Sequence, residues 1–169
     1  MEMTFRWYGE EDNVTLDQIK QIPGVEGIIS AIYDVPVGEA WPLSRIKKLK
    51  KKIENKGLNF KSIESVPVHE DIKMGLKSRD RYLENYKKTL RNLSEAGIEV
   101  VIYNFMPVFD WTRSQLDYHL DDGSRTLIYK ENTVEKMDPV SGDLDLPGWD
   151  TSYEDGELKE LMAQYKNIS

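Results

Sequence analysis

The sequence lacks several residues and signals that would point to common classes of protein. It contains no cysteine and only two histidines, His69 and His119. A disulfide framework is therefore excluded, and a site of three or four transition-metal ligands has few candidate residues. No apolar run approaches the roughly 18 residues that cross a bilayer, and the opening stretch MEMTFRWYGEEDN has no feature of a secretory signal. We therefore expect a cytoplasmic protein with no membrane partner.

Short motifs of phosphate-binding and hydrolytic chemistry are also absent. There is no glycine-rich phosphate loop, no His-Glu-x-x-His and no Gly-x-Ser-x-Gly. The net charge of -7 is opposite to the basic footprint of a nucleic-acid-binding protein, so no nucleic-acid partner is expected. In the one basic run, residues 47–52 (KKLKKK), Leu49 shares a helical period with Ile46 and Ile53. We interpret these lysines as the solvated face of an amphipathic helix.

The sequence does contain a fourfold alternation of strand-like and helix-like segments, in a chain apolar enough (39% hydrophobic residues) to form a folded domain. Strands are predicted at residues 3–7, 27–32, 59–65 and 99–104. Helices are predicted after the capping box that begins at Thr15, over residues 43–57 and 79–96, each ended by a glycine, and from residue 152. Strands separated by helices imply right-handed crossovers and a parallel sheet.

Four such units fit either an open α/β sheet or half of an eightfold barrel. Polar and aromatic residues follow every predicted strand, which favours the barrel, because barrel active sites use the carboxyl ends of all the strands. An open sheet would gather ligand groups at one switch point. Residues 105–151 are predicted to be an insertion within a single domain of residues 1–169. The insertion should hold a hairpin of residues 116–120 and 126–129 around an Asp-Gly turn, followed by irregular loop at 138–150.

The strongest candidate site residues lie at the ends of the first and third predicted strands. Arg6 offers a guanidinium group with paired donors for a carboxylate, and the aromatic rings of Trp7 and Tyr8 that follow it suit the apolar face of a sugar. The alternative for Arg6 is an ion pair with Glu10 or Glu11. Glu64 ends a buried strand, where a carboxylate is costly unless it is paired, which favours a functional or supporting role.

Four further residues leave the alternatives more open. Asn104 ends the fourth strand and could bind a hydroxyl group, whereas Asp110 could equally form a local ion pair with Arg113. His69 could bind a hydroxyl or carboxylate of a substrate, or it could be a histidine of a surface loop. His119 is interpreted as a hairpin residue that faces solvent or a partner. The residues alone thus indicate a rim suited to a polyhydroxy acid and do not name a reaction.

Four stretches carry a resemblance to a known family, and each lies at a predicted strand end. They are MTFRWYG (residues 3–9), SAIYDVPVGEAWP (30–42), SIESVPVHEDIKMG (62–75) and IYNFMPVFDWTR (102–113). Together they resemble the mannonate dehydratase family. The resemblance extends through the linking helices, including DRYLENYKKTLRNLSEAGIEVV, and covers at least residues 1–129.

The resemblance implies a (β/α)8 barrel of the xylose-isomerase-like group, of which this chain holds about the first four βα units. It implies a hydro-lyase that removes water from D-mannonate to give 2-keto-3-deoxy-D-gluconate during hexuronate breakdown, with bound Mn²⁺ or Fe²⁺. The residues carried over as facing or supporting the substrate are Arg6, Trp7, Tyr33, Glu64, His69, Asn104 and Asp110. The family holds its metal with His, Cys and Asp residues on later strands. This sequence matches none of those positions, so the catalytic acid and base stay unassigned and the chain alone is expected to hold no metal.

We therefore expect a mannonate dehydratase chain that is truncated before the metal site and is inactive by itself. Its open strand edges should drive self-association, so a homo-oligomer is expected. An alternative is a non-catalytic half-barrel that binds a sugar acid or pairs with a complementary chain. An isomerase or epimerase of the same barrel group is a third reading, which lacks the four stretches quoted above.

Overall fold

The computed structural model describes residues 2–106, 113–136 and 163. The chain divides into two compact units, Met1–Phe105 and Met106–Ser169. The boundary falls where the predicted insertion of residues 105–151 begins; the single domain of residues 1–169 stays a prediction. The predicted last helix from residue 152 and the predicted loop at 138–150 lie outside the described residues.

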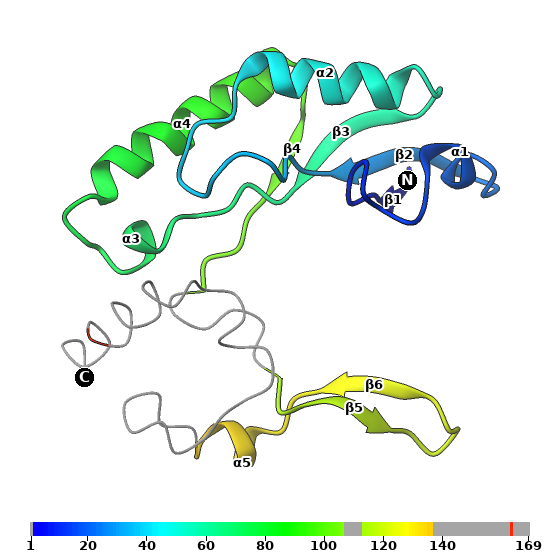
Figure 1. Ribbon diagram of the computed structural model, residues 1–169, viewed down its shortest axis with the longest axis vertical. Coiled ribbons are helices and arrows are strands. Elements are labelled where there is room, and N and C mark those ends of the chain that lie inside the picture. The colour runs from blue at the N-terminus through cyan, green and yellow to red at the C-terminus, as the bar shows by residue number, and fades with distance from the viewer. Residues whose placement is uncertain (1, 107–112, 137–162, 164–169) are drawn as a thin grey trace. The chain divides into compact units, whose positions relative to one another are not determined.

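A four-stranded parallel sheet forms the centre of the first unit (Figure 1). The strands are β1 (Met3–Arg6), β2 (Val25–Ser30), β3 (Asn59–Glu64) and β4 (Val100–Ile102), and they lie in this order across the sheet. All three neighbouring pairs are parallel. The predicted parallel sheet is therefore confirmed. The strands are parallel because each is followed by a crossover that returns the chain to the same end of the sheet.

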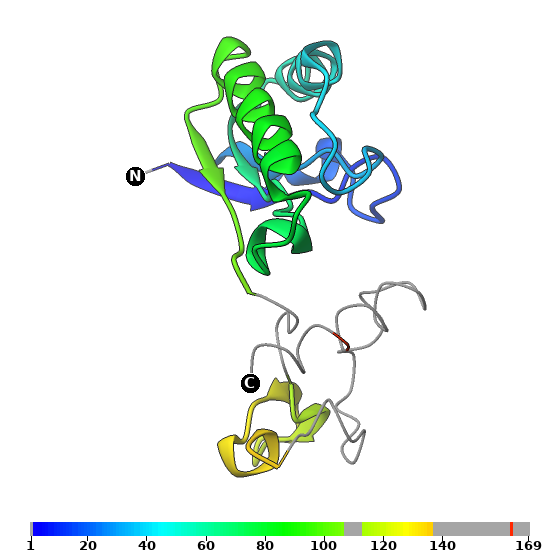
Figure 2. The same cartoon turned by 90° about the vertical axis from the view of Figure 1, so that its left-hand side faces the viewer.

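Two long helices, α2 (Leu43–Glu54) and α4 (Arg79–Glu95), lie side by side along one face of the sheet (Figures 1 and 2). The glycines predicted to end them do so: Gly57 and Gly97 have φ of 73° and 75°, a left-handed conformation that side chains disfavour. Two shorter helices are α1 (Leu16–Ile19) and α3 (Glu70–Lys73). The predicted capping box of Thr15 and Gln18 is present in α1, whereas α3 was not predicted.

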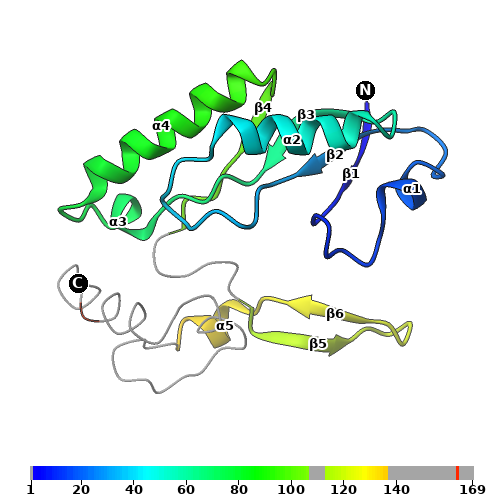
Figure 3. The ribbon, with the colours of Figure 1, turned by 45° about the horizontal axis from the view of Figure 1, so that its top comes forward.

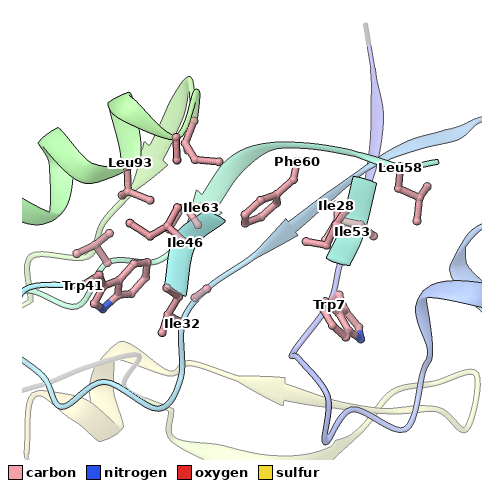
Figure 4. Packing of buried hydrophobic residues seen from close by; sticks show 14 of the residues in the cluster. Trp7, Ile28, Ile32, Trp41, Ile46, Ile53, Leu58, Phe60, Ile63 and Leu93 are labelled. Carbon is pink, nitrogen blue, oxygen red and sulfur yellow. The ribbon is translucent and has the colours of Figure 1, made fainter. Parts of the chain in front are cut away.

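The hydrophobic core fills the space between this face of the sheet and the helices (Figure 4). Ile28, Phe60 and Ile63 of the strands are each 1% exposed. Ile46 and Ile53 of α2 are buried in the same cluster. Burying one such side chain stabilises a fold by about 1.5–3 kcal/mol. The core on this one face of the sheet therefore supplies much of the stability of the first unit.

Helix α4 buries only part of its apolar surface in the core. Leu93 is buried, whereas Leu90 is 38% exposed. The residue that α4 buries beside Leu93 is Thr89, at 1% exposure.

Thr89 is buried because its hydroxyl group holds the segment that leads into α2. The backbone N–H of Trp41 donates to Thr89 Oγ1 at 3.0 Å, and that hydroxyl donates to Asn85 O at 3.1 Å. The side-chain amides of Asn85 and Asn92 donate to the carbonyls of Gly38 and Trp41. These bonds satisfy buried backbone groups that have no place in a helix or strand.

The second unit contains the predicted hairpin. Strands β5 (Gln115–His119) and β6 (Arg125–Ile128) pair antiparallel, and the short helix α5 (Glu131–Val134) follows them (Figure 3). Gly123 has φ of 84° in the turn, where the Asp122 side chain accepts the Ser124 N–H at 2.9 Å. His119 is exposed in β5. No helix in the described part of the chain is long and apolar enough to cross a membrane.

Replacing Thr89 by Val should lower the free energy of unfolding by about 1–3 kcal/mol, because the buried N–H of Trp41 would lose its acceptor while the packing volume stays nearly the same. Urea denaturation of the chain, followed by circular dichroism, measures the change. Thr4→Val, at an exposed position in the same unit, is the control and should shift the midpoint little. Equal effects of the two substitutions would contradict the role of the hydroxyl group.

Candidate functional site

Parallel pairing brings the carboxyl ends of β1 and β3 to the same edge of the sheet, together with the charged residues that end them. Arg6 is the last residue of β1 and Glu64 the last of β3. The guanidinium Nη1 of Arg6 lies 2.8 Å from Oε2 of Glu64. The side chains are 30% and 40% exposed, so the pair is reachable from solvent. Glu64 thus has the ionic partner that a carboxylate at the end of a core strand requires.

The alternative partners of Arg6 are not used. Glu10 pairs instead with Lys52 of α2. The short loop after β1 is held by Asp12, whose carboxylate accepts the N–H groups of Tyr8 and Val14, each at 2.9 Å. The backbone bond from Val14, followed by that from Tyr8, lowers the pKa of Asp12, because both stabilise the charged carboxylate.

Two tyrosines complete the cluster around Arg6. The guanidinium carbon lies 4.9 Å from the centroid of the Tyr8 ring, a distance at which a cation is attracted to the aromatic face. Tyr33 follows β2, its ring centroid lies 6.4 Å from that of Tyr8, and its hydroxyl group donates to Trp7 O at 3.5 Å. Tyr8 and Tyr33 are 60% and 51% exposed, so both rings are open to a ligand.

The environment of Arg6 keeps its charge fixed. Burial lowers the pKa of the guanidinium, but hydrogen bonds with the Tyr33 and Glu64 side chains act in the opposite direction and leave the pKa above its usual value. Its Nε atom is buried and has no hydrogen-bond partner among the described residues. The cluster can therefore offer guanidinium donors, carboxylate acceptors and two aromatic faces at one place.

A groove of about 660 Å³ adjoins this cluster and is lined in part by the same tyrosines. Ala31 and Ile32 line it from the end of β2, and Leu49 lines it from α2. Two ion pairs, Arg45 with Asp34 and Lys52 with Glu10, tie α2 to the loops that carry Tyr33 and Tyr8. The lysines of the 47–52 run are therefore not all free solvated charges: Lys50 also donates to Ala96 O at 2.8 Å.

The structure separates Trp7 from the cluster, although it is next to Arg6 in sequence. Its side chain is 3% exposed and belongs to the hydrophobic core (Figure 4). The reason is the alternation of a strand, which sends neighbouring side chains to opposite faces of the sheet. Trp7 can thus support the position of Arg6 but does not present its ring to a ligand here.

His69 has contacts of a structural kind. It is the N-cap of α3, where its Nδ1 accepts the Asp71 N–H at 3.1 Å, so the proton of the neutral ring is on Nε2. Its ring stacks on Tyr82 of α4, with centroids 3.6 Å apart. Asn104 is half-buried two residues after β4. Asp110 lies outside the described residues.

Tyr8 is the member of the cluster that is not among the residues carried over as facing or supporting the substrate. The available signal was its place after Arg6 and Trp7, since every second residue beyond a strand end can return to the same face. Among the described residues, no group of three His, Asp or Glu side chains is placed to hold a metal ion. The described residues therefore do not fit a metal centre.

Comparison with known proteins gives a consistent family. A family model described as D-mannonate dehydratase (UxuA) matches residues 1–169. The mannonate dehydratase 2 of Halalkalibacterium halodurans is 61% identical over 169 residues, which are 100% of this chain and 49% of that protein. The mannonate dehydratase of Streptococcus uberis is 56% identical over 168 residues, which are 99% of this chain and 48% of that protein.

A solved structure shows the same fold. The crystal structure of mannonate dehydratase from Streptococcus suis serotype 2 matches with a TM-score of 0.82 and 50% identity. The match covers 98% of this chain and 43% of that chain. The chain thus spans about half the length of the curated relatives and of the solved structure that it matches.

The Arg6–Glu64 pair should be energetically coupled, because both side chains are partly shielded from solvent. A double-mutant cycle with Arg6→Met and Glu64→Gln should give a coupling free energy near 1 kcal/mol in urea denaturation. The exposed Lys87–Glu84 pair of α4 is the control, for which a smaller coupling is expected because water screens the two charges. Coupling for Arg6–Glu64 that is no larger than for the control would contradict the proposed cluster.

Proposed function

Because this chain belongs to the D-mannonate dehydratase (UxuA) family, we propose that it forms the N-terminal half of a (β/α)8-barrel hydro-lyase. The complete enzyme would remove water from D-mannonate and form 2-keto-3-deoxy-D-gluconate in the cytoplasm, during hexuronate breakdown. The observation that carries the proposal for this chain is the Arg6–Glu64 pair beside two exposed tyrosines, at the carboxyl end of the strands of a parallel sheet. Barrel enzymes build their active sites at this end.

The part of the reaction assigned to this chain is recognition of the sugar acid. A guanidinium group donates hydrogen bonds and a carboxylate accepts them, so the pair matches the alternating donors and acceptors of neighbouring hydroxyl groups. Arg6 and Glu64 together carry no net charge, which favours the polyhydroxy portion of the substrate over its carboxylate. Tyr8 and Tyr33 would cover the apolar C–H face of the carbon chain.

The chemical step requires groups beyond this cluster. A base must take the proton from the carbon beside the carboxylate, and an acid must protonate the hydroxyl group that leaves from the next carbon. We propose Mn²⁺ or Fe²⁺ as the cofactor of the complete enzyme, which when bound would act as a Lewis acid on the developing enolate. The described residues do not fit this metal, so no step is assigned to them through it.

The remaining candidates have supporting roles in this proposal. Trp7 would fix the end of β1 from the core side, and His69 would fix the start of α3 against α4. Asn104 and Asp110 are proposed to face the substrate from the fourth strand end and the segment after it. The 169-residue chain by itself is proposed to form a homo-oligomer, because β1 and β4 are both edge strands of the described sheet.

A chimera tests the role of the cluster in catalysis. Residues 1–169 would be followed by the remaining residues of the Halalkalibacterium halodurans relative, and D-mannonate turnover would be measured with Mn²⁺. Arg6→Lys and Glu64→Gln should each lower kcat/KM about 10- to 100-fold, because a charged hydrogen bond is worth about 1.5–3 kcal/mol. Glu84→Gln on α4, outside the cluster, should leave kcat/KM unchanged. An active chimera that is insensitive to both cluster substitutions would overturn the assignment.

The isolated 169-residue chain should show no turnover of D-mannonate above the enzyme-free background, with either Mn²⁺ or Fe²⁺ supplied. The physical reason is that the described residues bring no metal-binding group to the strand ends. Formation of the 2-keto product, followed by a colorimetric assay for 2-keto-3-deoxy acids, is the measurement. Turnover by the purified chain would show that its own residues complete the site.

A further inference from the structure

Three segments of the first unit meet at Gly38, in the loop between β2 and α2. A Cβ atom added at Gly38 would lie 2.6 Å from His69 Cδ2 and 2.6 Å from Tyr82 Cδ1. The φ of Gly38 is 85°, a left-handed conformation that side chains disfavour. Only a glycine therefore lets this loop approach the two rings so closely. We call Gly38, His69 and Tyr82 together the loop joint.

The two rings of the loop joint are held against each other. Their centroids lie 3.6 Å apart and their planes differ by 10°, so the rings are stacked. The His69 ring is also fixed at its Nδ1 atom, which accepts the Asp71 N–H at 3.1 Å. Because the rings are packed face to face, neither can move aside for a larger residue at position 38 without losing these contacts.

Helix α4 holds the backbone of this loop as well. The side-chain amide of Asn85 donates to Gly38 O at 2.9 Å, although the two residues are 47 positions apart in sequence. Nearby on the same helix, Arg81 Nη2 lies 3.6 Å from Glu39 Oε1. The start of α4 thus fixes the loop through the Tyr82 ring, a backbone carbonyl and an ion pair.

On one side, the loop joint is connected to Tyr33 of the candidate site. The segment from Tyr33 to Gly38 is short, and Pro36 within it fixes one backbone angle and accepts the Glu39 N–H at 3.1 Å in a turn. The Tyr33 ring is exposed, and its hydroxyl bond to Trp7 O is long, at 3.5 Å. A displacement of Gly38 should therefore be passed along this segment and move the ring.

On the other side, the loop joint is connected to Glu64. Residues 64–69 continue from the end of β3 to His69, and within them Val66 and Val68 are buried. Buried side chains at two positions leave this segment little freedom to shift. The loop joint therefore fixes the segments after β2 and β3 against each other, and with them the separation between the Tyr33 ring and the Glu64 carboxylate.

We propose that Gly38 and Tyr82 are positioning residues of the candidate site: acting through His69, they set the separation between Tyr33 and Glu64 and thereby the affinity for a sugar acid. Neither residue needs to contact the ligand. The choice of ligand rests on the proposed function, whereas the positioning rests on the geometry of the loop joint. Because recognition is assigned to this site, loss of the joint should weaken substrate binding and leave the chemical step unchanged.

Proton NMR of the 169-residue chain tests the positioning without reference to activity. The ring protons of His69 should resonate upfield of those of His119, because the Tyr82 ring lies against His69 whereas His119 is exposed in β5. Tyr82→Leu should remove this upfield shift and move the ring signals of Tyr33. Tyr82→Phe should preserve both, because it keeps the stacked ring. Leu93→Ala, at a buried position of the same helix, is the control for lowered stability and should leave both sets of signals in place.

Steady-state kinetics of the chimera of the two proteins tests the consequence for binding. Gly38→Ala and Tyr82→Leu should each raise KM for D-mannonate about tenfold and change kcat less than about twofold, because a displaced recognition group weakens binding. Tyr82→Phe should have the KM of the unsubstituted chimera. Leu93→Ala should lower the melting temperature without raising KM, as a purely structural change does. Gly38→Ala provides the same test if Tyr82→Leu does not fold.

The outcomes separate this proposal from the proposed function. An inactive chimera together with the expected shifts of the Tyr33 signals contradicts the function and supports the positioning role. An active chimera whose KM is unchanged by Gly38→Ala and Tyr82→Leu overturns the positioning role and leaves the function in place. Tyr33 signals that do not move in the Tyr82→Leu chain, or that move equally with Leu93→Ala, also overturn it, whether or not the chimera is active.

Discussion

Parallel hydrogen bonding between β1, β2, β3 and β4 is the constraint on which the rest of this structure depends. Parallel strands cannot be joined by tight turns, so each connection must cross the sheet, and it does so on one side. That requirement places α2 and α4 on one face and concentrates the core there (Figure 2). It also places the carboxyl ends of all four strands at the same end of the sheet. Arg6 and Glu64 form their ion pair there, although they are far apart in sequence.

The two faces of the sheet are consequently unequal. The helix-covered face buries Ile28, Phe60 and Ile63 almost completely, whereas the other face of β4 leaves Val100 and Ile102 partly exposed. Among the described residues, the sheet has one covered face and two open edges, which are the layers of half a barrel, and the match to the Streptococcus suis structure agrees with this description. The parallel α/β fold expected from the alternating segments, and the half barrel implied by the resemblance, are thereby confirmed.

The site has the same dependence on the sheet. Arg6 and Glu64 lose little hydration free energy when they form their ion pair, because both side chains stay partly exposed to water. Each charge also neutralises the other. Tyr8 and Tyr33 are held beside them by the short loops that Asp12 and α2 restrain. In the proposed function, a neutral pair beside aromatic rings would recognise hydroxyl groups by the direction of their hydrogen bonds rather than by charge, which suits a polyhydroxy acid.

The sequence by itself determined the local features, because their causes are local. The capping box at Thr15, the glycines at 57 and 97 and the Asp-Gly hairpin each depend on residues within one or two turns of chain. The parallel pairing also followed from the sequence, since strands separated by helices imply right-handed crossovers. The need of Glu64 for a partner could be predicted as well, because a carboxylate at the end of a buried strand is costly alone.

Only the tertiary structure decided which partner each residue took. Arg6 forms its ion pair with Glu64, because the pairing of β1, β2 and β3 brings the ends of β1 and β3 close together. Glu10 forms its ion pair with Lys52 of α2 instead. The Trp7 side chain is buried in the core, whereas the Tyr8 ring lies beside Arg6. Which of the two is buried depends on which face of the sheet the helices cover. Thr89 is buried, although it is polar, because its hydroxyl group accepts the backbone N–H of Trp41, which lies far away in sequence. Each of these outcomes depends on contacts between segments distant in sequence, which local patterns do not encode.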